Sequence, residues 1–147
     1  MRNMTRGWLT LLALALTSVL GLATAPAAAA YAAGNSTWGV VCAFGKCIPS
    51  GTLLHVIDGR GIALSYDRAQ VTSGGSLCNW WIDFDYYDIR NNRYRHIQGT
   101  AHQSCTHNGY VRIDYPAGPY RWETGRACAT LYSSAIYLTR QCHYLHP

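Results

Sequence analysis

Six cysteines constrain the fold of this chain more than any other feature of its sequence. An even number of cysteines in a short exported chain implies a disulfide framework rather than free thiols. Bridges of this kind stabilise domains that are too small to bury a large core. We therefore expect a compact fold held by three disulfides and built for an oxidising compartment. The cysteines are Cys42, Cys47, Cys78, Cys105, Cys128 and Cys142.

The first 33 residues are typical of a secretory signal peptide that export removes. Arg2 and Arg6 give a positive start, the run from Trp8 to Leu22 is mostly apolar, and small residues follow. This order of regions is that of a signal peptide. The apolar run is shorter than the roughly 20 residues of a membrane span, so an uncleaved anchor is the weaker alternative. We expect a secreted, extracellular protein without a membrane span, cleaved between Ala30 and Gly34.

The rest of the chain shows strand periodicity and almost no helical periodicity. Residues Leu77 to Ile89 alternate clearly between apolar and polar, the pattern of a half-buried strand. Asn91-Asn92 and Asn108-Gly109 are turn signals, the second a strong hairpin signal, and Thr72 to Ser76 reads as a flexible loop. Short strands at such spacing predict an all-β fold, a compact antiparallel sandwich or barrel of about eight strands.

The sequence divides into two parts after the signal peptide. Residues 34–51 form an N-terminal segment that is apolar, rich in glycine and closed by two cysteines. Residues 52–147 supply the alternating strands of a single β domain, and we expect the core to be complete from Thr52 onward. The first segment is then an extension of the domain, free to dock into a partner.

The short spacing of Cys42 and Cys47 predicts a disulfide-closed hairpin. If Phe44-Gly45 is a two-residue turn, the cysteines face each other within disulfide range. So short a loop mainly stiffens the tip, which favours a preformed insertion element. A fraying terminus pinned by a staple is the alternative. For the remaining cysteines we favour Cys78–Cys105 and Cys128–Cys142, because each bridge would link neighbouring strands.

Enzymatic interpretations have candidate residues but no defined spacing. A small secreted ribonuclease needs a base, an acid and a cation for the phosphate. Paired carboxylates on one strand face, Asp83 and Asp85, raise the question of glycosidase chemistry, although ordinary solvated strands alternate in the same way. The net charge of +5 is scattered, so it does not require nucleic acid as a partner. The candidates for ribonuclease chemistry are Glu123, Arg121, Arg126, His55, His96, His102, His107 and His143.

Two further clusters have a structural and a functional interpretation. His102, Cys105 and His107 faintly resemble a zinc site, but Cys105 is better explained by a disulfide. Trp81, Tyr86, Tyr87 and Trp122 would form an exposed aromatic patch for sugars or protein, unless they pack in the core or at an edge.

A resemblance to a known family rests on short sequence stretches rather than on a diagnostic motif. The stretches "LLHVI", "LSYD", "CNWW", "DYPAGPY", "ACATLY" and "QCHYL", between Leu53 and Leu145, resemble small secreted actinobacterial domains related to spore-associated protein A. With the addition of "STWGVVCAFGKCIPSG", the chain is similar to the adaptor subunits of secreted umbrella toxin particles of Streptomyces-type bacteria. The resemblance implies a non-enzymatic adaptor that joins a lectin subunit to the ALF-repeat spokes of a large toxin protein. It also implies that Trp38 to Pro49 docks into the repeat groove.

We therefore expect a binding module without a cofactor or bound metal, whose N-terminal segment inserts into a partner. Apolar anchors commonly dominate the energy of such an interface. The alternatives are a small secreted ribonuclease and an inhibitor of an extracellular hydrolase. The residues expected to bind the partner are Trp38, Val40, Val41, Phe44, Lys46 and Ile48.

Overall fold

The fold is all-β, as predicted, and is known here from a computed structural model that describes residues 31–116 and 122–147. The proposed signal peptide lies outside these residues up to position 30. Ten strands account for most of the described chain. They are β1 (Ala32–Trp38), β2 (Val41–Ala43), β3 (Lys46–Ile48), β4 (Gly51–Arg60), β5 (Ala63–Leu77), β6 (Trp80–Asp88), β7 (Arg93–Gln98), β8 (Thr106–Asp114), β9 (Gly125–Ser133) and β10 (Ile136–Leu145).

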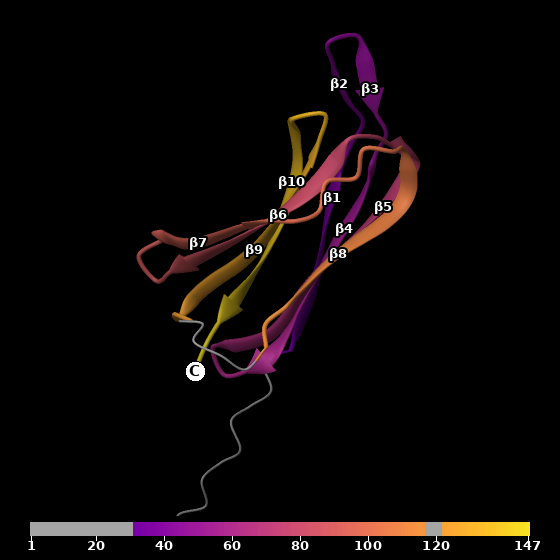
Figure 1. Ribbon diagram of the computed structural model, residues 1–147. Coiled ribbons are helices and arrows are strands. Elements are labelled where there is room, and N and C mark those ends of the chain that lie inside the picture. The colour runs from indigo at the N-terminus through magenta and orange to yellow at the C-terminus, as the bar shows by residue number, and fades with distance from the viewer. Residues whose placement is uncertain (1–30, 117–121) are drawn as a thin grey trace, which may run out of the picture.

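Two four-stranded antiparallel sheets pack face to face as a sandwich. The first sheet has the order β1-β4-β5-β8, and the second has the order β10-β9-β6-β7. The short strands β2 and β3 form a separate hairpin that projects beyond one end of the sandwich (Figure 1). Edge strands β1 and β10 contact each other, so the sheets are close together on that side.

The core follows from the alternation of the strands. In β6, Trp80, Ile82, Phe84 and Tyr86 point inward and are completely buried, as the sequence pattern predicts. Leu53 of β4 and its neighbours on the first sheet cover them from the opposite side. Burying this apolar surface is the main stabilising contribution in a domain of this size.

Two local expectations are wrong, and both errors concern glycine-rich stretches. Residues 72–76 form part of β5 rather than a flexible loop, and Asn108-Gly109 lies inside β8, where Gly109 pairs with Val71. A Cβ atom on Gly109 would lie 2.3 Å from the Trp80 ring. Gly109 is therefore small because the indole packs against the strand, and not because the chain turns there. The turn expected at Asn91 is present, since Asn91 has a φ of 66°.

The expectation that the core is complete from Thr52 onward is also wrong. Strand β1 pairs with β4 from Ala32↔Ile57 to Trp38↔Gly51, so it is a full member of the first sheet. Trp38 and Ile48 are buried in the core cluster. Because Ala32 and Ala33 belong to β1, cleavage after Ala30 would keep this strand whole, whereas cleavage after Ala33 would shorten it.

All three disulfide pairings predicted from the sequence are confirmed. The bridges join Cys42–Cys47, Cys78–Cys105 and Cys128–Cys142. Three bridges in one small domain indicate an extracellular or otherwise oxidising compartment. The part of the chain that the structure describes contains no helix long and apolar enough to cross a membrane.

Candidate functional site

The projecting hairpin is the strongest candidate for an interaction site. Strands β2 and β3 pair directly, with Cys42 opposite Cys47 and a Cα–Cα distance of 4.0 Å. Phe44 and Gly45 form the turn, and both have positive φ angles, 52° and 73°. This backbone is the one that suits a two-residue hairpin turn, and the glycine adopts it without a steric penalty. The bridge and the turn together hold the tip in one conformation.

Apolar side chains at and beside the tip are exposed. Phe44 is 97% exposed and Val40 is 65% exposed. Lys46 is also exposed, whereas Val41 is partly buried against the core cluster. The rigid turn holds this large aromatic side chain in water, where it lacks the apolar contacts that a partner protein would supply.

Two of the residues expected to bind a partner instead attach the hairpin to the domain. Trp38 and Ile48 are only 6% and 8% exposed. The indole Nε1 of Trp38 donates a hydrogen bond of 2.7 Å to the Pro49 carbonyl oxygen, across the base of the hairpin. Of the six expected anchors, these two are therefore not accessible in this structure, and the exposed set is smaller than expected.

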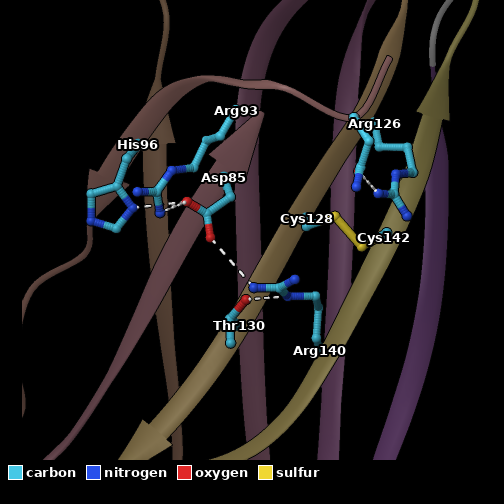
Figure 2. Close-up of polar contacts among 9 residues, drawn as sticks. Asp85, Arg93, His96, Arg126, Cys128, Thr130, Arg140 and Cys142 are labelled. Carbon is cyan, nitrogen blue, oxygen red and sulfur yellow. Dashed lines mark hydrogen bonds and ion pairs between the residues drawn. A yellow bond between two sulfur atoms is a disulfide. The ribbon is translucent and has the colours of Figure 1, made fainter. Parts of the chain in front are cut away.

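The second candidate site is a cluster of polar side chains around Asp85, on the outer face of the second sheet (Figure 2). Asp85 is buried, and its Oδ1 accepts a hydrogen bond of 3.1 Å from Arg93 Nη1. His96 Nδ1 lies 2.9 Å from the same oxygen, and Arg140 Nη2 lies 3.7 Å from Oδ2. Arg140 also donates a hydrogen bond of 2.8 Å to Thr130 Oγ1. Two arginines and a histidine from two edge strands thus surround one carboxylate of β6.

This arrangement could orient a histidine base, but it is not enclosed. An acid that holds one imidazole nitrogen leaves the other free for proton transfer. Catalytic sites, however, are usually concave. The two described cavities lie near the β6–β7 turn and the C-terminus, and neither is lined by Asp85 or His96. The side chains of Arg93 and His96 are 53% and 42% exposed, so this face is open to solvent.

The other candidates for ribonuclease chemistry are dispersed. His55 and His143 are buried in the core, and the His102 ring stacks on Trp80. His107 is exposed on β8. Arg126 lies over the Tyr87 ring and contacts Asn91, on β9. Glu123 lies beside Tyr94, whose hydroxyl oxygen accepts a hydrogen bond from the Glu123 backbone amide, and Arg121 lies outside the described residues. Among the residues that the structure describes, the expected acid, base and cation are not brought together.

The paired carboxylates of β6 have different surroundings. Asp83 shares the outer face with Asp85, but its Oδ1 is buried and accepts no hydrogen bond from the protein. Burial raises the pKa of Asp83 above its usual value, although His96 acts in the opposite direction.

In the zinc-like stretch, Cys105 is in a disulfide as expected, and no three potential metal-binding side chains of the described chain are grouped together.

A buried polar network between the sheets was not found by sequence reasoning. His55 Nε2 lies 2.7 Å from Asp67 Oδ1, and the Tyr86 hydroxyl donates a hydrogen bond of 2.7 Å to Asp67 Oδ2. The Tyr115 hydroxyl completes the network through Tyr86, and His143 Nε2 lies 2.9 Å from the His55 carbonyl oxygen. The signal that was available is a histidine in the apolar run "TLLHVI".

The aromatic patch expected from sequence does not form as such. Tyr86 is completely buried, and Trp122 packs edge-on against Tyr86 and Tyr115. Trp81 instead stacks on Tyr132, with ring centroids 5.3 Å apart.

No protein-family model, no curated protein and no solved structure matches the chain.

Proposed function

We propose that this protein is a secreted, non-enzymatic adaptor whose hairpin docks into a groove of a large secreted toxin protein. The observation that supports the proposal is Phe44, 97% exposed at the tip of a disulfide-closed, projecting hairpin. The resemblance to adaptor subunits of umbrella toxin particles supplies the class of partner, a repeat-containing toxin protein. It also supplies the second partner in the proposal, a lectin subunit.

The physical argument for docking is one of preorganisation. Binding costs free energy when flexible loops must become ordered, and a rigid loop avoids most of that cost. The Cys42–Cys47 bridge and the Phe44-Gly45 turn fix the tip before any partner is present. Val40 and Phe44 then supply apolar anchors, and Lys46 places a positive charge beside them for an acidic groove rim.

The buried residues at the base of the hairpin change the experiment that suits this proposal. Deleting residues 36–48 would remove three of the seven residues of β1 and two core side chains, so a loss of binding could simply reflect unfolding. The sharper variant is Phe44→Ser, which alters only an exposed side chain. The matched control is Tyr110→Ser, because Tyr110 is also aromatic and exposed, at 65%, but lies on β8.

The assay is quantitative co-purification from the medium of the native secreting organism. We expect the tagged wild-type protein and Tyr110→Ser to retain a large repeat-containing protein and a lectin. Phe44→Ser should retain at least about tenfold less of the large protein, the loss of a central aromatic anchor. A photo-crosslinking residue at position 44 should label that same protein. Equal recovery with Phe44→Ser, or purification of the wild type as a lone monomer, would contradict the proposal.

A further inference from the structure

The outer face of the second sheet carries three aromatic side chains in a row, well separated from the exposed tip of the hairpin in sequence. The register pairs Trp81 of β6 with Tyr132 of β9, and Tyr132 with Tyr137 of β10. The first two rings are nearly parallel, and the Tyr132 and Tyr137 centroids are 6.1 Å apart. We call these three residues the aromatic row. Tyr137 is 55% exposed, so the row is open to solvent at one end.

A polar row runs beside the aromatic row, one step further along the strands. Asp83 pairs with Gln98 of β7 on one side and with Thr130 of β9 on the other. Thr130 in turn pairs with Arg140 of β10. Residues two apart on a strand lie roughly 7 Å apart on the same face, so the two rows are neighbours. Together they supply aromatic rings, a carboxylate, an amide and a guanidinium over four strands.

An irregularity in β10 makes this arrangement possible. Tyr137 and Arg140 are three residues apart, which would place them on opposite faces of a regular strand. The register shifts between Tyr137 and Thr139. As a result Tyr137 contacts Tyr132, and Arg140 contacts Thr130, on the same outer face. Bulges of this kind redirect side chains and are common beside functional sites.

Asp83 places a partly buried carboxylate, with one unsatisfied oxygen, directly beside the aromatic row. Its Oδ1 is buried and accepts no hydrogen bond from the protein. A buried carboxylate oxygen without a donor is costly, and such atoms are almost always paired. The Asp83 side chain is hydrogen-bonded to that of Trp81, and the part of the carboxylate that stays open to solvent can accept a hydrogen bond from a ligand hydroxyl.

We infer that this face binds a saccharide, with its hydroxyl groups toward the polar row and its apolar ring atoms against the aromatic row. The chemistry favours a sugar over a protein partner. Acidic residues are depleted in the central part of a protein interface, whereas here Asp83 directly borders the three rings. A sugar needs both kinds of surface within a few ångströms, since each ring presents hydroxyls and C–H groups together.

Binding to insoluble polysaccharides tests the inference on the intact protein. The probes are cellulose, chitin, starch granules and purified bacterial peptidoglycan, with the unbound protein measured after sedimentation. We expect retention on at least one of them, and at least tenfold weaker retention for Tyr137→Ala and for Asp83→Asn. Tyr137 is exposed, so its loss should leave the unfolding temperature unchanged, and Asp83→Asn keeps the side-chain volume.

The controls separate this inference from the proposed function. Tyr110→Ala removes an exposed aromatic residue from the other sheet and should bind polysaccharide like the wild type. Phe44→Ser should also do so, although it is expected to lose the toxin partner. The inference is overturned if the protein binds none of the four probes. It is equally overturned if both face variants bind as well as the wild type, or if the lectin subunit covers Tyr137 in the complex.

Discussion

Replacing Gly109 with alanine tests how tightly the core side chain of Trp80 packs against β8. A Cβ atom on this residue would lie 2.3 Å from Cζ2 and 2.6 Å from Cη2 of Trp80. Both distances are far below an ordinary contact, and the indole is completely buried, with little freedom to move. Overpacking by one methyl group in a filled core costs about 1–3 kcal/mol. At about 4 °C per kcal/mol for a domain of this size, Gly109→Ala should lower the Tm by several degrees.

Thermal unfolding followed by circular dichroism measures the effect, with Gly39→Ala as the matched control. A Cβ atom on Gly39 would meet nothing within 4 Å, so this variant should unfold like the wild type. Trp80→Phe then identifies the cause, because phenylalanine lacks the outer part of the indole that Gly109 contacts. In the Trp80→Phe background, Gly109→Ala should cost at least about 0.5 kcal/mol less than in the wild type.

The opposite result would show that the reasoning is wrong. If Gly109 were needed for a hairpin turn at Asn108-Gly109, alanine would be unfavourable whatever residue occupied position 80. An equal cost of Gly109→Ala in both backgrounds would therefore refute the packing explanation.

Two further predictions concern the bridges and pH. Replacing Cys42 and Cys47 with serine should lower the free energy of unfolding by about 2 kcal/mol. The same replacement of Cys78 and Cys105 should lower it by about 3–4 kcal/mol, because the second bridge closes a longer loop. Urea unfolding of the two double variants measures the difference. Burial lowers the pKa of His143 below its ordinary value of 6.5, so its contribution to stability is present above that pH and is lost as the pH falls below it. The thermal unfolding midpoint should thus fall as the pH is lowered below about 6.5, and His143→Gln should make this fall shallower. An unchanged slope would exclude this residue as the cause.

Local signals in the sequence were sufficient for the disulfides and the hairpin. Cysteines five positions apart around Phe44-Gly45 can close only one kind of turn, and the alternation of β6 identifies its buried face without knowledge of the neighbouring strands. In both cases the residues that decide the structure lie close together in the chain. For the same reason the fold class could be predicted from strand periodicity alone.

Contacts between distant segments could not be predicted in this way. Asn108-Gly109 has the composition of a turn, and only the packing of Trp80, almost 30 residues earlier, shows why it lies in a strand. The Asp85 cluster depends on the register among β6, β7, β9 and β10, which no local pattern determines. Trp38 and Ile48 looked like exposed anchors because the pairing of β1 with β4 was not visible in the sequence.

The hairpin leaves and rejoins the first sheet at a single cross-strand pair, Trp38 and Gly51. The chain between them is therefore an insertion, and the pairing of β1 with β4 holds its two ends side by side. A different sequence could replace residues 42–47 without altering any strand of the sandwich, provided that Val41 and Ile48 still pack against the core and Pro49 still accepts the indole hydrogen bond. The domain is thus a natural scaffold for loop grafting, in which new binding specificities can be introduced at the tip while the two sheets remain unchanged.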